Sequence, residues 1–411
     1  MISARTYGLL GCVLLWGCAR VDRDPGANLV RDSAGLRIVE NTQPTWKPDA
    51  GWRIENEPGL QFGPEYPLYQ VSGAYRLPDG RIVLAHASVP EILTFSPDGR
   101  LLQRNGKRGE GPGEFGQFNR VRRGSNDSIL VLDYLTRVSV LTPDGRYVRS
   151  FRVPNLPNGS AAILEDVFGD GSLLVTPVGG VPSGQRLERR RRQLWRLDPR
   201  TGAATELATF AELETYHFQK TIPRPIAFRR PFFGKTAYYI AGQDRLYWAM
   251  TDSFQINVDG LDGKLVTRIR RRHETRRFGA GEVTELIETA VTGHDVPAAR
   301  PALRRVLEEL PRSGTVPAFG WPDYGPSYGP ILMLDDDQNL WVAEYYMPGE
   351  ARNARTVFAA DGTWLGTVEL PDRFSPTHIG SDFILGVWRD ELDVEHIRLY
   401  ELVKPGDPLD P

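Results

Sequence analysis

The chain has 411 residues, of which 40% are hydrophobic and 25% are charged, and its formal net charge at pH 7 is −2. This length leaves room for a large core, and the balanced charge excludes a general affinity for nucleic acid and an acidic tail. Glycine and proline, with 42 and 32 residues, are frequent enough to favour a fold with many tight turns.

The N-terminus has the pattern of an export signal. Arg5 precedes an apolar run, Tyr7–Trp16, that is too short to span a bilayer. The run ends at Leu-Trp-Gly-Cys, which resembles a bacterial lipobox and predicts cleavage before Cys18 and lipid attachment to it. A second match at Cys12 leaves about six apolar residues ahead of it, fewer than a signal core needs. An ordinary secretory signal, or a membrane anchor without lipid, is the alternative.

We therefore expect a lipoprotein signal peptide at residues 1–18, a polar tether at 19–35 and a folded domain at 36–411. Once Cys12 is removed and Cys18 is lipidated, no cysteine is left for a disulfide, so the core must supply the stability. Ala19 after the lipidated cysteine predicts sorting to the outer membrane. We expect membrane contact through the lipid anchor alone.

The folded domain repeats one pattern six times. In residues 75–118, two Pro-Asp-Gly turns each lie between short runs rich in β-branched and aromatic residues. The first turn recurs from Asp79 to Asp127 and Asp170 after 48 and 43 residues, a spacing typical of propeller blades. The near-continuous apolar strand after this turn lies at 81–85, 128–133, 172–177, 245–250, 339–344 and 383–388.

The sequence predicts an all-β fold, a six-bladed β-propeller of four-stranded antiparallel blades. The blades are expected at 71–105, 119–153, 163–210, 237–270, 331–370 and 376–402. The sixth copy lacks an outer strand, and an N-terminal strand at 52–58 would complete it and close the ring. Residues 36–41 form a further strand whose place the sequence does not decide.

Strand order predicts which face of the propeller carries the long loops. The turns between first and second and between third and fourth strands are tight, whereas the long connections lie at 178–192, 211–236, 271–329 and 345–354. These join second to third strands or one blade to the next, so they share one face, where binding residues concentrate. The insertion at 271–329, between blades 4 and 5, predicts a helical hairpin over 280–291 and 301–310, either a lid or partner surface or a cover for apolar loops.

The best-preserved copy resembles a known repeat. GKRGEGPGEF at 106–115, followed by NRVRRG, a buried VLD at 131–133 and RVSVLTPDG at 137–145, resembles the NHL repeat and the six-bladed propeller lipoproteins of environmental bacteria. The resemblance extends over 71–153 and, less closely, over 331–402. It implies the fold and leaves function open, because NHL-type propellers include scaffolds and binding modules as well as lyases and lactonases. Gly109–Phe115 itself is interpreted as a crossing between blades.

A metal or catalytic site would need several His, Asp or Glu side chains converging on the channel. The six histidines show no metal-binding spacing. Asp133, Asp252 and Glu344 stand at equivalent positions, where the second strand ends, and together they could bind one Ca²⁺. Solvated or salt-bridged carboxylates are the simpler interpretation. A carboxylate-bound calcium ion would make the protein a hydrolase or lyase, similar to lactonases and streptogramin lyases, which is the competing hypothesis for its function.

Aromatic side chains in the long loops are the clearest sign of recognition, although they would also serve as core at the channel mouth. The binding candidates are Asp133, Tyr134, Asp252, Trp321, Tyr324, Tyr328, Glu344 and Tyr345. Arginine clusters at 189–192 and 268–277 could hold a polyanion or belong to a solvated face. We expect a monomeric module without catalytic residues, cofactor or nucleic acid, which binds an envelope protein, a peptide or a sugar. A scaffold that uses the helical hairpin is a third hypothesis.

Overall fold

The structure is a computed structural model that describes residues 28–405 except 48–49, 64, 67, 117, 134–135, 180–186, 218–227, 293–295, 313, 322–328, 348–349 and 351, with the backbone alone at 118–119, 125, 217 and 228–229. The predicted signal peptide with Cys18, and the candidates Tyr134, Tyr324 and Tyr328, lie outside the described residues.

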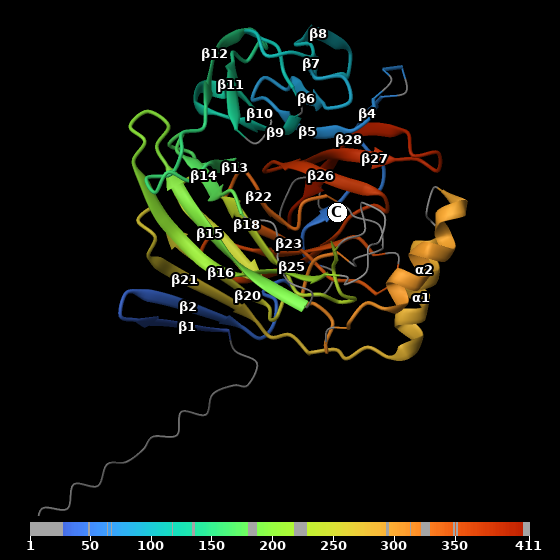
Figure 1. Cartoon of the computed structure of the whole chain (residues 1–411). Coiled ribbons are helices and arrows are strands. Elements are labelled where there is room, and N and C mark those ends of the chain that lie inside the picture. Colours follow the sequence, from blue (N-terminus) through green and yellow to red (C-terminus); the bar gives the residue numbers. More distant parts are fainter. Residues whose placement is uncertain are drawn as a thin grey trace, which may run out of the picture.

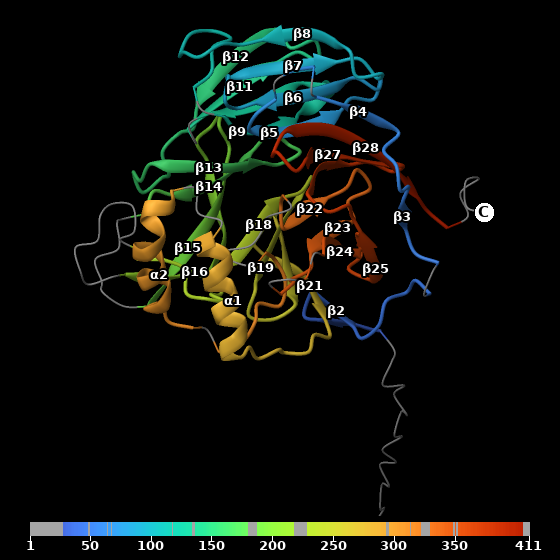
Figure 2. The same cartoon turned by 90° about the vertical axis from the view of Figure 1, so that its right-hand side faces the viewer.

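Six sheets, whose blade strands pair in antiparallel order, surround a common axis and form a six-bladed β-propeller, as predicted (Figures 1 and 2). Blade 1 consists of β5 (Val71–Arg76), β6 (Ile82–His86), β7 (Glu91–Phe95) and β8 (Leu101–Asn105). Blade 2 consists of β9 (Phe118–Arg123), β10 (Ile129–Asp133), β11 (Arg137–Leu141) and β12 (Tyr147–Arg152), with a 3₁₀ turn η1 (Ser125–Asp127) after β9. Blade 3 consists of β13 (Ala162–Val167), β14 (Leu173–Pro177), β15 (Leu187–Leu197), β16 (Ala204–His217) and the short β17 (Phe228–Arg229).

The second half of the ring follows the same order. Blade 4 consists of β18 (Ala237–Ala241), β19 (Arg245–Met250), β20 (Gln255–Gly260) and β21 (Leu265–Arg271). Blade 5 consists of β22 (Leu332–Leu334), β23 (Leu340–Ala343), β24 (Ala354–Phe358) and β25 (Trp364–Glu369). Blade 6 consists of β26 (Phe374–Ile379), β27 (Phe383–Arg389) and β28 (Glu395–Val403).

Residues 29–62, which we call the N-terminal strap, hold three blades together. β1 (Leu29–Ser33) and β2 (Leu36–Asn41) form a hairpin, and β2 adds in parallel to β21 at the outer edge of blade 4. The strap then hydrogen-bonds to β25 of blade 5, where the backbone N–H of Trp46 donates to the carbonyl of Leu365 at 2.8 Å. It ends on blade 6, where β3 (Arg53–Ile54) and β4 (Leu60–Phe62) both pair with β28.

The strap corrects two expectations. The tether expected at 19–35 is shorter, because Leu29–Ser33 is a strand of the blade 4 sheet. The closing strand expected at 52–58 consists of two short pieces, and the second, Leu60–Phe62, lies beyond the expected range. Asn41 fixes the strap, since its side chain donates to the carbonyls of Arg270 and Gly362 and accepts from the N–H of Trp364.

Blade 3 corrects a third expectation, because residues 187–192 and 211–217, expected in loops, continue strands β15 and β16. Cross-strand pairs extend this hairpin: Arg192 donates from Nε to the Glu212 carboxylate at 2.6 Å, and Arg189 to the Glu212 carbonyl at 3.0 Å. The charged residues of these segments thus pair with each other across an antiparallel ladder, which stabilises it.

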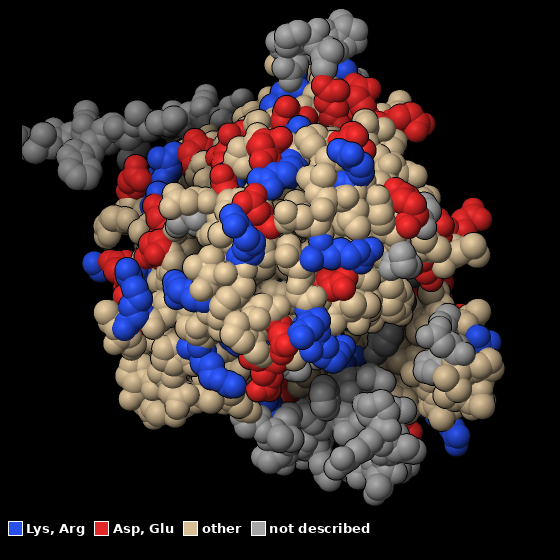
Figure 3. Space-filling view, turned by 90° about the horizontal axis from the view of Figure 1, so that it is seen from above, with Lys and Arg blue, Asp and Glu red and all other residues tan. Residues whose placement is uncertain are grey.

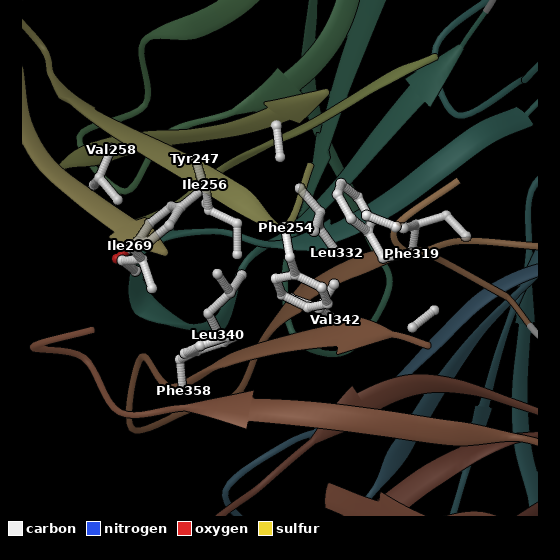
Figure 4. Packing of buried hydrophobic residues seen from close by; sticks show 14 residues of the cluster. Tyr247, Phe254, Ile256, Val258, Ile269, Phe319, Leu332, Leu340, Val342 and Phe358 are labelled. Atoms are coloured by element: carbon white, nitrogen blue, oxygen red, sulfur yellow. The ribbon is translucent and has the colours of Figure 1, made fainter. Parts of the chain in front are cut away.

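An apolar cluster fills the seam between each pair of neighbouring blades. Figure 4 shows the seam between blades 4 and 5, where the Phe254 ring packs close to Val342 and Leu332. The second strands are buried on both faces because each face meets another blade; all five residues of β6 are buried.

The insertion before blade 5 contains the described helices, α1 (Ala280–Thr292) and α2 (Arg300–Glu308), with a 3₁₀ turn, η2 (Pro297–Ala299), ahead of α2. Val283, Leu286 and Leu307 face a cluster that includes Phe232 and Phe233, so the hairpin packs beside the connection between blades 3 and 4. In Figure 2 the two helices lie side by side. Neither of these helices is long and apolar enough to cross a membrane.

Candidate functional site

A cavity of about 1680 Å³ follows the axis of the propeller and is lined by the inner strands of the blades. Residues from β5, β9, β13, β18, β22 and β26 all contribute to its wall. Four of these inner strands carry a β-bulge, at Val71/Gly73, Phe118/Arg120, Leu164/Asp166 and Pro376/His378. Bulges re-aim side chains, and three of these precede polar residues near the channel.

The Trp321 indole lines one part of the channel wall and packs among buried side chains. The indole N–H of Trp321 donates to the carbonyl of Gly329 at 2.8 Å, which fixes the ring. The ring centroid of Tyr346 lies 6.0 Å away, and the Arg355 guanidinium lies 4.8 Å from the centre of the indole. Burial lowers the pKa of Arg355 to about 9. Tyr346 and Arg355 are buried and hold the Trp321 indole in place at the channel wall.

Two arginines of the channel wall, Arg120 and Arg122, form a charged group with the buried Asp166 of blade 3. Arg120 and Arg122 alternate along β9, and Asp166 follows the bulge in β13. Arg122 makes a two-point ion pair with Asp166, with Nε–Oδ1 at 2.7 Å and Nη2–Oδ2 at 2.9 Å. Arg120 makes a longer contact of 3.3 Å from Nη1 to Oδ2. Burial opposes ionisation of Asp166, but the charges of Arg122 and Arg120 outweigh it and lower its pKa.

A second polar network lies behind this wall, between blades 3 and 4. Arg192 binds Glu212 and also donates to Glu165 at 3.3 Å and to the Thr176 hydroxyl at 3.1 Å. Tyr239 lines the channel beside it, and burial together with the charge of Glu165 raises the pKa of its phenol far above the ordinary value. The Glu165 carboxylate is thus already bound by a guanidinium, and Tyr239 stays protonated at physiological pH.

The three carboxylates predicted as calcium ligands each pair with an arginine. Asp133 is fully buried, accepts from the N–H of Gly116 at 2.9 Å and pairs with Arg137, which also donates to carbonyls of the Gly109–Phe115 crossing. Asp252 makes a two-point pair with Arg189 at 2.8 and 2.6 Å. Glu344 accepts from Arg271 at 2.6 Å and from Thr356 at 2.6 Å. For Asp252 and Glu344, burial opposes ionisation, but the paired arginine lowers the pKa.

These carboxylates do not converge. None of the three lines the channel, and the described residues contain no group of three or more His, Cys, Asp or Glu arranged to hold a metal ion. Carboxylates bound by guanidinium groups are poor ligands for Ca²⁺, which needs six to eight oxygens. The described residues therefore do not fit the calcium site that the sequence suggested.

The two remaining described candidates, Trp321 and Tyr345, lie in different parts of the protein. Trp321 lines the channel, whereas Tyr345 packs against the apolar cluster under the helical hairpin. Gly109–Phe115 is held by hydrogen bonds to Arg137 and by the Lys107–Glu114 pair at 3.0 Å. Asp335 accepts from Asn339 and from the Trp341 indole, so this turn is part of the blade.

Several solved structures are similar to this chain in fold, all at low identity. A member of the DUF4221 family from Bacteroides vulgatus is 13% identical, with a TM-score of 0.48, and the match covers 86% of this chain and 99% of that one. A putative exported protein from Bacteroides fragilis is 12% identical, with a TM-score of 0.44, over 89% and 99%. Virginiamycin B lyase from Staphylococcus aureus is 11% identical, with a TM-score of 0.40, over 86% and 100%.

No protein family matches the sequence. No curated protein is similar to it either.

Sequence reasoning missed the charged group in the channel. The signal was present in Arg120 and Arg122, because arginines two positions apart on a strand share a face, and the repeat places this strand innermost. Their cross-strand neighbours, Leu132 and Leu130, face blade 3. The partner Asp166 could not be paired with them from sequence, because the bulge in β13 sets its position.

Proposed function

We propose that this protein is a cell-envelope binding module, anchored by a lipid on Cys18, which holds its ligand in the central channel without catalysing a reaction. The expected ligand is a peptide or a sugar, free or presented by an envelope protein. The channel, together with the loops that border it, serves as the site. This places the protein among NHL-like propellers that act by binding.

The observation that carries the proposal is the cavity of about 1680 Å³ whose wall combines the Trp321 indole with the guanidinium groups of Arg120 and Arg122. A cavity with apolar surface and a few fixed polar groups is the usual form of a ligand site. Aromatic rings held by packing and hydrogen bonds supply contact area at low entropic cost.

The state of the carboxylates argues against the competing hydrolase or lyase. Asp133, Asp252 and Glu344 are engaged by arginines at separate places. The arginine clusters, which could have bound nucleic acid, are similarly occupied: Arg189 and Arg271 have carboxylate partners, and Arg268 binds Asn257. In Figure 3, basic and acidic side chains are intermingled over the described part of the face shown.

The test is a binding screen of the purified protein against short peptides and cell-wall oligosaccharides, read by thermal shift and by saturation-transfer NMR. We expect one chemical class to bind, and Trp321→Ala to weaken that binding at least about tenfold, as loss of a central aromatic contact does. Trp388→Ala is the matched control, because Trp388 lies outside the channel lining.

Three outcomes would contradict the proposal. The first is equal loss of binding in both tryptophan variants. The second is turnover of a lactone or streptogramin by the unmodified protein. The third is a fall in melting temperature on addition of a chelator that Ca²⁺ restores, because that result would support a bound calcium ion.

A further inference from the structure

The seam between blades 2 and 3 differs from the others at its inner end. Leu132 and Val138 of blade 2 meet Leu164 and Val175 of blade 3 in an apolar cluster, as in the other seams. On the same face of blade 2, however, the inner strand carries Arg120 and Arg122 in place of apolar residues. The channel wall is therefore charged where this seam opens into it.

The channel also extends sideways into this seam. The cavity lining continues from the inner strands to Leu130, Val140 and Phe151 of blade 2 and to Leu173 of blade 3. Arg149 and Arg200 line the same extension. Its walls are thus apolar side chains from two blades, with guanidinium groups at its borders.

Arg120 has more hydrogen-bonding capacity than its described partners use. One of its nitrogens, Nη1, contacts Asp166 at 3.3 Å and the carbonyl of Glu165 at 3.4 Å. Asp166 is already bound at two points by Arg122. The Arg120 side chain keeps 43% of its surface accessible, and this surface belongs to a residue of the cavity wall.

The local charge balance leaves one guanidinium without a carboxylate of its own. Arg120 and Arg122 share the single charge of Asp166, and the nearby Glu165 carboxylate is bound by Arg192. The accessible part of the Arg120 guanidinium is therefore free to pair with a further anion in the channel.

We propose that Arg120, supported by Arg122, forms an anion subsite in the channel, and that the ligand carries one carboxylate or phosphate group next to an apolar chain that enters the seam between blades 2 and 3. The anion would accept from the Nε and Nη2 donors of Arg120, in the two-point geometry that guanidinium groups favour. Leu130, Val140, Phe151 and Leu173 would contact the apolar chain. This inference rests on the proposed binding function and specifies the ligand class.

The test compares three probes with the same eight-carbon chain: octanoate, octyl phosphate and the neutral octanamide. Dissociation constants are measured by NMR titration of the unmodified protein, of Arg120→Gln and of Arg104→Gln. Arg104 lies on the outer strand of blade 1, where it pairs with Glu91, and it does not line the channel. Arg104→Gln therefore removes one positive charge at a distant place.

We expect at least one of the two anions to bind about tenfold or more tightly than octanamide, as a charge-assisted hydrogen bond implies. Arg120→Gln should abolish this preference, and Arg104→Gln should keep it. A preference limited to octanoate or to octyl phosphate would identify the anion as a carboxylate or a phosphate. Circular dichroism of Arg120→Gln distinguishes loss of the subsite from loss of the fold.

The inference is overturned if octanamide binds as tightly as both anions, if the preference survives in Arg120→Gln, or if none of the three probes binds. The proposed binding function is tested separately. If a peptide or sugar from the screen still depends on Trp321, the channel binds ligands and the anion subsite alone is wrong. If neither the screen nor the probes give binding, both proposals fail.

Discussion

Arg122 and Asp166 face each other across the inner seam between blades 2 and 3 and are joined by two parallel hydrogen bonds of 2.7 and 2.9 Å. Only 2% of the Asp166 side chain is accessible, so removing its charge leaves two arginines without compensation. We expect Asp166→Asn to lower the free energy of unfolding by about 2–3 kcal/mol at pH 7, measured by urea denaturation.

The control for Asp166 is Asp170→Asn, because Asp170 pairs with Arg196 near the surface, where about 1 kcal/mol or less is expected. The pKa of Asp166 is lower in the folded protein than the ordinary value of 3.8. Its contribution is therefore complete above about pH 4 and is lost as the pH falls through the folded value. Equal effects of the two variants at pH 7 would show that the seam does not depend on this pair.

Asp259 has the opposite pH dependence. It lies on β20, accepts from the Trp248 indole at 2.7 Å and is almost fully buried, and burial raises its pKa from 3.8 to about 6. A raised pKa means that the folded state binds the proton more tightly, so stability is gained below about pH 4 and lost as the pH rises through 6. At pH 8, Asp259→Asn should therefore have a higher free energy of unfolding than the unmodified protein, by about 1–3 kcal/mol, and should unfold at a higher urea concentration.

The same substitution provides its own control. At pH 4 the Asp259 carboxyl group is largely protonated in the folded state, so most of the advantage of Asp259→Asn should disappear. Indole fluorescence should change with a midpoint near pH 6 in the unmodified protein and not in the variant. An advantage that is constant from pH 4 to pH 8 would refute this account.

Asn41 connects the N-terminal strap to two blades through one buried amide. Replacing it by alanine leaves the carbonyls of Arg270 and Gly362 and the N–H of Trp364 without this partner. We expect Asn41→Ala to cost about 2–4 kcal/mol of unfolding free energy, because unsatisfied buried backbone groups are expensive. Asn158→Ala, which removes one exposed turn contact, should cost much less. A loss below about 1 kcal/mol for Asn41→Ala would contradict this role.

The helical hairpin is expected to unfold separately from the ring. Leu307 is fully buried in the cluster shared by α1, α2, Phe232 and Phe233, and its replacement by alanine should cost about 2–5 kcal/mol within that cluster. In Leu307→Ala, amide hydrogens at 280–308 should exchange faster than in the unmodified protein, while strands such as β6 and β23 stay protected. Uniformly faster exchange throughout the blades would show that the hairpin and the ring unfold as one unit.

The fold was predictable because its signals are local and repeated. The Pro-Asp-Gly turns demand a glycine with positive φ, as at Gly80 and Gly99 with 87° and 84°. Six apolar strands follow tight turns of related sequence, most of them at blade spacing. The N-terminal strap was only partly predictable. The partner of Leu36–Asn41 is a parallel strand more than 200 residues away, and no local pattern distinguishes one outer strand from another.

The site was less predictable than the fold. Asp133, Asp252 and Glu344 occupy equivalent positions in the repeat, but these positions lie on different blades. Each carboxylate pairs there with an arginine. Trp321 lines the cavity, and its role in binding stays a prediction. Arg120 and Asp166 meet through a seam between blades and a bulge, and neither is encoded in the spacing of residues along one strand.

The N-terminal strap also determines when this chain can finish folding. Asn41 hydrogen-bonds to residues 229 and 323 positions further along the chain, and β3 and β4 have no partner until β28 exists. Contacts of such high sequence separation are slow to form. The N-terminal strap therefore cannot complete its pairing before β28 is available, so the ring closes only when strands from both ends of the described chain are present.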